Sequence, residues 1–202
     1  FEALARHPPR ALVITGAGRV FCAGFHIGEL EGADDPRLFE RVVDALEALP
    51  MPTLARLNGS VYGGATDLVL ACDFRLGVAG MELRMPAARL GLHYYPSGLQ
   101  RYVSRLGLGA AKRLFLLAEN VPADELQRIG YLDEVVAAEL LDAAVERVVQ
   151  ALAANAPLAV RGMKRSLDEI ARGVVDLPAL RERVAACARS ADLREGLAAF
   201  AD

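Results

Sequence analysis

The stretch Gly63-Gly64-Ala65-Thr66-Asp67 decides the fold that we expect, because it joins an extended apolar run (53–61) to a second apolar run (68–72). A Gly-Gly pair between a strand and a helix lets a ligand approach the backbone closely. The first N–H groups of a helix lack internal partners and attract negative charge. Backbone donors beside the carboxylate of Asp67 therefore suggest chemistry on a carbonyl group. The same residues also fit a plain tight turn with an acid in the first helical turn.

Strand-like and helix-like segments alternate on both sides of this stretch. Short apolar or β-branched runs predict strands, and apolar residues at helical spacing predict helices. Residues 21–30 combine glycines with apolar side chains, which predicts irregular backbone packed against a pocket. The expected strands are 11–15, 53–58, 73–78 and 82–85, and the expected helices between them are 38–49 and 65–72. Such alternation is typical of an α/β fold.

The second half of the chain has a mostly helical pattern with one further strand. The predicted strand is 131–136, and the predicted helices are 99–106, 110–118, 122–130, 139–154, 158–171, 180–188 and 194–201. No Ser-, Gly- or Pro-rich linker separates the halves. We therefore predict one structural unit, with an α/β core over residues 1–136 and a helical extension over residues 137–202. The apolar face of that extension packs either on a neighbouring subunit or on its own core.

Composition excludes several classes of function. The net charge of −3 over 202 residues gives no global basic field for nucleic acid. No apolar run approaches the roughly 18 residues that a membrane span needs. The three cysteines have no pair or metal spacing, which favours a reducing, cytoplasmic location. The histidines are too dispersed for a metal site, and no nucleotide-binding fingerprint is present. We thus expect no nucleic acid, membrane, metal or separate cofactor.

An ordered set of short motifs resembles the crotonase (enoyl-CoA hydratase/isomerase) superfamily over essentially the whole chain. These motifs are 12–18 (LVITGAG), 21–24 (FCAG), 58–59 (NG), 63–64 (GG), 71–75 (ACDFR), 89–92 (RLGL), 98–101 (GLQR), 107–112 (GLGAAK) and 194–200 (REGLAAF). The resemblance implies a spiral of ββα units with a C-terminal helical trimerisation region, assembled as a homotrimer or hexamer. It also implies that the N-terminal strands and first helix of the family would precede residue 1.

The family resemblance implies an acyl-CoA thioester as substrate. Two backbone N–H groups, those of Phe25 and Gly64, would hold the thioester oxygen as it becomes an enolate. The surrounding backbone at Ala23, Gly24 and Gly63 would contribute to binding of the CoA ester. The bulky Phe25 ring would narrow the acyl pocket.

The resemblance also exposes a missing acid. Hydratases of the family use two acids, and Asp67 occupies the first of these positions, one methylene shorter than the usual Glu. The second position is held by Ala87, which cannot transfer a proton. A one-acid reaction such as double-bond isomerisation therefore fits the residues better than hydration, although the acid that isomerases of the family usually carry is also at the position of Ala87.

The segment His93-Tyr94-Tyr95 replaces a small Pro/Gly-containing turn of the family. Tyr94 falls where the decarboxylase branch has a functional Tyr, so Asp67, Tyr94 and His93 are the catalytic candidates. Half-buried aromatic packing is the alternative for this segment. His26, at a position usually held by Asp, is expected to make a structural hydrogen bond. Three functions stay open: an enoyl-CoA hydratase/isomerase-type enzyme using Asp67, an acyl-CoA decarboxylase using Tyr94 or His93, and a non-catalytic protein that binds CoA esters.

Overall fold

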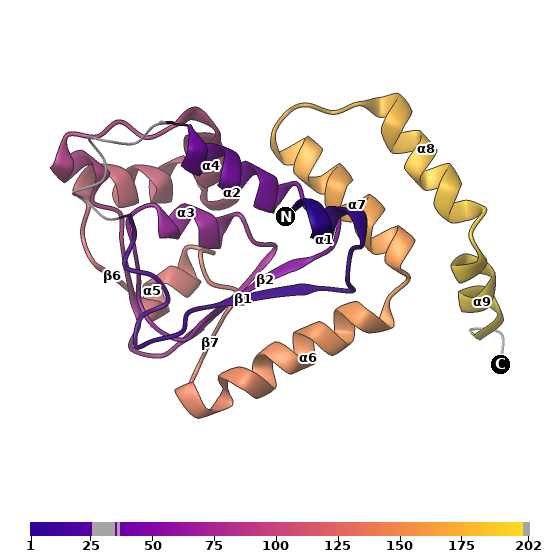
Figure 1. The fold of residues 1–202 in the computed structure, drawn as a ribbon, viewed down its shortest axis with the longest axis horizontal. Helices are drawn as coiled ribbons and strands as arrows, with labels where there is room; N and C mark the ends of the chain where they lie inside the picture. The colour runs from indigo at the N-terminus through magenta and orange to yellow at the C-terminus, as the bar shows by residue number, and fades with distance from the viewer. Residues whose placement is uncertain (26–34, 36, 200–202) are drawn as a thin grey trace.

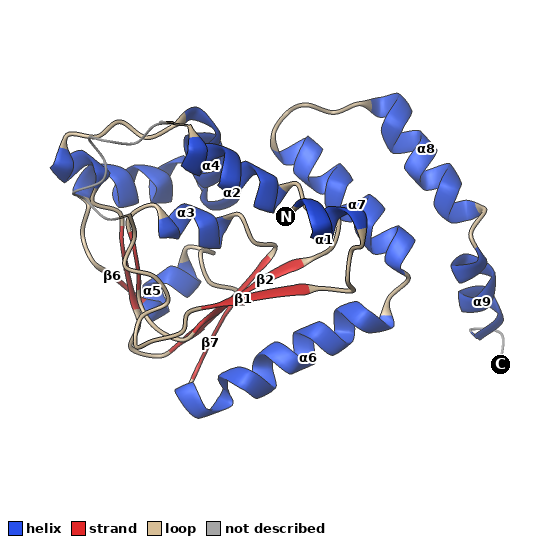
Figure 2. Ribbon diagram, in the orientation of Figure 1, coloured by secondary structure: helices blue, strands red, loops and turns tan. Residues whose placement is uncertain are grey.

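A four-stranded parallel sheet forms the centre of the protein. The computed structural model describes residues 1–25, 35 and 37–199. The sheet has the order β1-β2-β4-β7, and a smaller sheet beside it has the order β3-β5-β6 (Figure 2). The strands are β1 (Leu12–Thr15), β2 (Thr53–Leu57), β3 (Val61–Tyr62), β4 (Phe74–Val78), β5 (Glu82–Arg84), β6 (Val121–Pro122) and β7 (Glu134–Val136). The predicted α/β architecture is confirmed.

Helices cover both faces of the central sheet. The α-helices are α1 (Glu2–Arg6), α2 (Leu38–Glu47), α3 (Ala65–Leu70), α4 (Pro96–Lys112), α5 (Ala123–Arg128), α6 (Leu141–Ala154), α7 (Pro157–Ala171), α8 (Leu177–Ala188) and α9 (Ala191–Ala199). Short 3₁₀ turns span Ala87–Leu90 and Ala138–Leu140, and a π-helical turn spans Arg113–Leu117. In Figure 1, α2, α3 and α4 lie on one side of the sheet and α6 on the other, whereas α7, α8 and α9 extend to the right.

The core explains why these segments form strands. β2 is buried along almost its whole length, as expected for a central parallel strand of mostly apolar residues. β1 alternates between half-buried and exposed residues, because it lies at the edge of the sheet.

Two buried tyrosines anchor α3 to the remaining core. The Tyr131 hydroxyl donates to the carbonyl oxygen of Thr66 over 2.7 Å, and the Tyr102 hydroxyl lies 2.6 Å from Oγ1 of the same threonine.

Several element boundaries differ from the sequence prediction. The segment predicted over 99–106 and the first residues of the one predicted over 110–118 belong to α4, which is kinked at Gly107 (φ 79°, ψ 160°), and residues 113–117 form the π-helical turn. α4 starts earlier than predicted, at Pro96, since proline suits the first helical position. The strand predicted over 131–136 begins only at Glu134. β3 and β6 were not predicted separately, because two residues carry no detectable periodicity.

A buried cation ties the helical extension to the core. Lys164 of α7 lies 2.5 Å from Oδ1 of Asp73, and the other oxygen of that carboxylate accepts hydrogen bonds from the backbone and hydroxyl of Thr53. α6 packs against β2 and β4, so the first helix of the extension covers part of the central sheet.

Apolar side chains remain exposed farther along α7, α8 and α9: Met163, Leu167, Ile170, Val184 and Leu197. Trimer or hexamer assembly, and the boundary at residue 136, stay predictions. No helix within the described ranges is long and apolar enough to cross a membrane.

Candidate active site

Two backbone segments that are distant in the sequence run side by side at the candidate site. Cys22 forms a parallel bridge with Val61, and the N–H of Tyr62 donates to the carbonyl oxygen of Cys22 over 3.0 Å. A β-carbon placed on Gly63 would lie 3.8 Å from the α-carbon of Gly24, so the two glycines face each other. The residues that follow them, Phe25 and Gly64, therefore lie on adjoining backbone segments.

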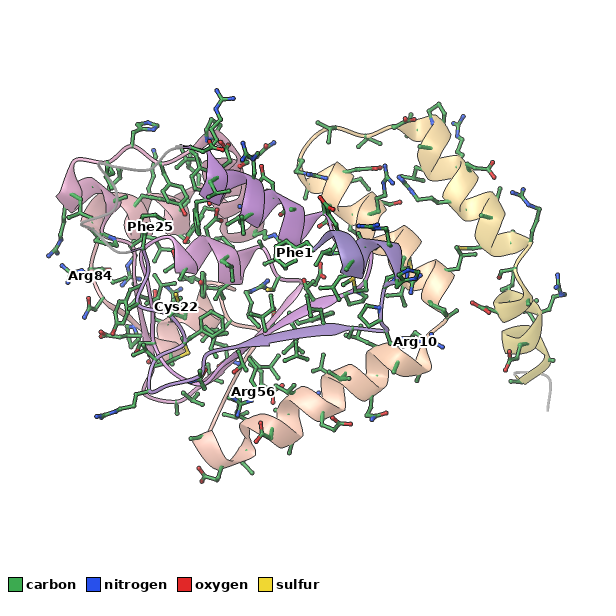
Figure 3. The ribbon with its side chains drawn as sticks, viewed as in Figure 1. Phe1, Arg10, Cys22, Phe25, Arg56 and Arg84 are labelled. Carbon is green, nitrogen blue, oxygen red and sulfur yellow. The ribbon has the colours of Figure 1, made fainter. Side chains whose placement is uncertain are left out.

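Figure 3 shows Cys22, Phe25 and Arg84 on the same side of the molecule, near the small sheet. The labelled Arg10, which precedes β1, lies toward the opposite end of the central sheet. The site thus lies beyond the carboxyl ends of the parallel strands β1 and β2, where open α/β sheets usually bind ligands.

The backbone conformation requires glycine at both positions that precede the Phe25 and Gly64 amides. Gly24 has a φ of 92°, and a β-carbon there would lie 2.8 Å from the carbonyl oxygen of Tyr62. Gly63 has a φ of 58°, and its N–H donates to the carbonyl oxygen of Arg84. Among the contacts of the described residues, the N–H groups of Phe25 and Gly64 have no acceptor. These are the two amides predicted to hold the thioester oxygen.

Asn58 fixes the loop that leads from β1 to Phe25. Its Oδ1 accepts the N–H of Gly16 over 3.0 Å, and its Nδ2 donates to the carbonyl oxygen of Gly18 over 2.6 Å. A β-carbon on Gly59 would lie only 2.3 Å from the carbonyl oxygen of Arg19. The Asn-Gly motif after β2 therefore sets where the first of the two amides is placed.

Asp67 lies in the first turn of α3 and is completely buried. Its Oδ2 accepts a hydrogen bond from Nη1 of Arg101 over 2.7 Å and another from the Tyr95 hydroxyl. Its Oδ1 is buried without a hydrogen-bond partner among the described residues. Burial raises the pKa of this carboxyl, although the Arg101 charge and the Tyr95 hydrogen bond oppose the shift.

The tyrosine that binds Asp67 is Tyr95, the neighbour of the predicted Tyr94. The two rings stack with centroids 4.3 Å apart, and their hydroxyl oxygens are 3.4 Å apart. Burial, followed by the charge of Asp67, raises the pKa of both tyrosines, so they remain neutral donors. A β-carbon on Gly98 would lie 2.5 Å from the Tyr94 ring and 2.9 Å from Oδ2 of Asp67. Glycine at that position therefore permits the close packing over the acid.

The other predicted residues make no contact with Asp67 among the described interactions. His93 is exposed, and its Nδ1 lies 2.8 Å from the carbonyl oxygen of Tyr94. Ala87 is buried at the start of a 3₁₀ turn. Ala23 is exposed beside Gly24, and its part in CoA binding stays a prediction, as does the catalytic role of His93. His26 lies outside the described residues.

Sequence reasoning missed the role of Arg101, which it treated only as part of a motif. The guanidinium of this α4 residue is 1% exposed and also contacts Asp44 and Glu47 of α2. Burial opposes the ionisation of Glu47, but the hydrogen bond and charge of Arg101 lower the pKa of its carboxyl overall. Arg101 comes one helical turn after Gly98, which packs on Asp67, and this spacing is a signal that could have identified it.

An aromatic side chain also flanks Gly64. A β-carbon on that glycine would lie 3.0 Å from the ring of Phe39, and this ring meets the Tyr95 ring edge-on with centroids 6.0 Å apart. Phe39 of α2 thus borders both Gly64 and the Tyr95 ring that covers Asp67.

A separate cavity of about 530 Å³ lies between the end of α2 and helices α7 and α8. Its lining includes Glu47, Arg161, Asp168, Arg172 and Arg183. None of the predicted site residues lines this cavity. We therefore place the candidate active site at the amides of Phe25 and Gly64 and at Asp67.

Comparison with known proteins identifies the family of the chain. A sequence model of the enoyl-CoA hydratase/isomerase family matches residues 2–202. The chain is 32% identical to a short-chain-enoyl-CoA hydratase of Clostridium acetobutylicum, over 94% of this chain and 76% of that protein. It is equally similar, at 32% identity and the same coverage, to a crotonyl-CoA hydratase of Syntrophomonas wolfei.

Solved structures show the same fold. Subunit I of an enoyl-CoA hydratase from Geobacillus kaustophilus aligns with a TM-score of 0.87 and 31% identity, over 98% of this chain and 80% of that one. An enoyl-CoA hydratase from Bacillus anthracis aligns with a TM-score of 0.87 and 28% identity, over 98% and 83% of the two chains. The crotonase-type fold expected from the motifs is therefore confirmed. With matches that span nearly its whole length, the chain belongs to the enoyl-CoA hydratase/isomerase family.

Proposed function

We propose that this chain acts on an acyl-CoA thioester and stabilises an enolate with the backbone N–H groups of Phe25 and Gly64. The proposal is supported by the pairing of their backbone segments and by the absence of an acceptor for either amide among the described residues. Donors fixed in this way are suited to a developing oxyanion, because no reorganisation is needed as the charge forms.

Within this family, a double-bond shift in an enoyl-CoA is the reaction that these residues support best. It needs one base that takes a proton from one carbon and returns it to another, while the electron pair passes through the enolate. Asp67 offers one buried oxygen, Oδ1, without a partner among the described groups, and this observation carries the proposal. Ala87 offers no second acid for the addition of water.

A second candidate function is acyl-CoA binding without turnover. It is favoured by the complete burial of Asp67 and by its ion pair with Arg101, which are also typical of a structural carboxylate. Because Oδ1 is buried, a substrate can reach it only if the side chains around Asp67 shift. Decarboxylation has less support, because the Tyr94 hydroxyl faces that of Tyr95 and His93 is exposed.

The deciding experiment compares wild type with Asp67→Asn on a series of enoyl-CoA substrates. Acyl-CoA affinity is measured by titration calorimetry on both proteins. We expect isomerase turnover in wild type, a loss of about 10²- to 10⁴-fold in the variant, and similar affinity. Turnover that survives the substitution would exclude Asp67 as the base. Binding without turnover by wild type would instead support the second candidate, and release of CO₂ from malonyl-CoA would support decarboxylation.

A further inference from the structure

A single guanidinium joins the candidate base to two carboxylates of another helix. Nη1 of Arg101 lies 2.7 Å from Asp67 Oδ2, Nε lies 3.0 Å from Glu47 Oε1, and Nη2 lies 2.8 Å from Asp44 Oδ1. The Asp67 side chain is 0% exposed and the Glu47 side chain 9% exposed. The planar guanidinium is therefore held on several edges, and its orientation is fixed.

The other cation near this cluster does not contact Asp67. Arg105 lies 3.0 Å from Glu47 and 3.7 Å from Asp168, and it donates to backbone carbonyl oxygens at the end of α3. Besides Arg101 and Glu47, the titratable groups that face Asp67 among the described residues are the neutral hydroxyls of four tyrosines. These come from the segment before α4, from α4 itself and from the segment before β7: Tyr94, Tyr95, Tyr102 and Tyr131. Arg101 is thus the cation that neutralises Asp67 within the described structure, and it does so while also binding Glu47.

We propose that Arg101 is a positioning residue that, together with Tyr95, binds Oδ2 of Asp67, leaves Oδ1 as the reactive oxygen, and divides its charge between Asp67 and Glu47. The chemical part of this inference rests on the proposed function, since a reactive oxygen presupposes a reaction. The division of charge is independent of turnover. Glu47 competes for the same cation, so its removal should act on Asp67 in the direction opposite to removal of Arg101.

The test follows the ionisation of Asp67 itself in the full chain, by ¹³C NMR of aspartate-labelled protein across pH. The Asp67 carboxyl signal is assigned by its loss in Asp67→Asn. We expect Arg101→Gln to raise the titration midpoint of Asp67 by about one pH unit or more, because an opposite charge at hydrogen-bond distance is lost. We expect Glu47→Gln to lower that midpoint. Arg105→Lys is the matched control, because it retains a cation beside Glu47 and leaves the contacts of Asp67 intact.

Opposite shifts in the first two variants, with none in the control, support the inference. Shifts of the Asp67 titration midpoint in the same direction in both variants, or no shift in Glu47→Gln, overturn the inference. If Arg101→Gln does not fold, the result for Glu47→Gln decides. Isomerase assays separate the two proposals. A wild type without turnover but with opposite midpoint shifts refutes the proposed function alone. Turnover with unmoved midpoints refutes the role of Arg101 alone.

Discussion

Tyr62 donates its backbone N–H to the carbonyl oxygen of Cys22 over 3.0 Å, and this bond joins the segments that carry the amides of Phe25 and Gly64. The amides of Phe25 and Gly64 are therefore positioned by pairing of main chain with main chain. The side chain at position 25 can therefore vary without moving its donor, provided that glycine remains at position 24. This explains how the bulky Phe25 is compatible with the proposed enolate site.

Gly64→Pro should reduce kcat on an enoyl-CoA by about 10²- to 10³-fold, since it deletes one N–H donor. The φ of Gly64 is −57°, which suits the proline ring. Gly64→Ala is the control, because it adds the same β-carbon near Phe39 and retains the donor. Both variants are compared by kcat and by thermal melting. Equal kcat values in the two folded variants would contradict a role for this amide.

Tyr95→Phe should lower the free energy of unfolding at pH 7 by about 1.5–3 kcal/mol, since Asp67 loses a donor to its charged form. Tyr94→Phe should cost less than about 1 kcal/mol, because its hydroxyl has only a 3.4 Å contact with that of Tyr95. Urea denaturation measures both losses.

The loss in Tyr95→Phe should also depend on pH. The folded-state pKa of Asp67 is raised, so its burial costs least when the carboxyl is protonated. The difference between Tyr95→Phe and wild type should therefore grow as pH rises through that pKa. A difference that does not change with pH would argue that the hydroxyl stabilises the fold without acting on the ionised acid.

In Glu47→Gln, the free energy of unfolding should fall less steeply as the pH is lowered than it does in wild type. The pKa of Glu47 is lowered on folding, so its contribution is present above its ordinary value of 4.5 and is lost as pH falls through the folded-state pKa. We expect a cost of about 1.5–3 kcal/mol at pH 7, measured by urea denaturation, that shrinks in acid. Glu139→Gln, an exposed acid, is the control and should follow wild type. A cost that is constant across pH would contradict this account.

Gly59→Ala should destabilise the protein by about 1–3 kcal/mol and lower kcat, because its β-carbon meets the backbone at Arg19. The displaced loop is the one that leads to Phe25. Gly18→Ala lies in the same loop with no atom within 4 Å of the added carbon, so its change should stay within about 0.5 kcal/mol. Melting curves and kcat check both variants. Similar effects at the two positions would argue against a tight fit at Gly59.

The parts of the site that depend on local sequence could be predicted. The apolar run 53–58 corresponds to β2, and the Gly-Gly pair immediately precedes α3, because propensity and turn chemistry act over a few residues. The contacts of Asp67 could not be predicted in the same way. They come from α4 and the segment before α4, whose placement against α3 is decided by packing.

The choice between two adjacent tyrosines shows this limit clearly. Tyr94 was expected from the resemblance to the decarboxylase branch, yet Tyr95 is the tyrosine that donates to Asp67. The backbone before α4 is irregular, so no periodicity indicates which hydroxyl faces the acid. Arg101 was missed for a related reason, since its partners lie on α2 and α3, far from it in the sequence.

The closed layer over Asp67 has an isotopic consequence. The carboxylate is 0% exposed, and Tyr95 and Gly98 cover its Oδ2, so a hydrogen held on Oδ1 should exchange slowly with bulk solvent once these side chains close over a bound substrate. During a double-bond shift in D₂O, the hydrogen removed from one carbon should therefore be delivered to the next before deuterium replaces it. Mass spectrometry of the product should find mostly unlabelled molecules, and this enzyme would carry the substrate's own hydrogen from one carbon to another.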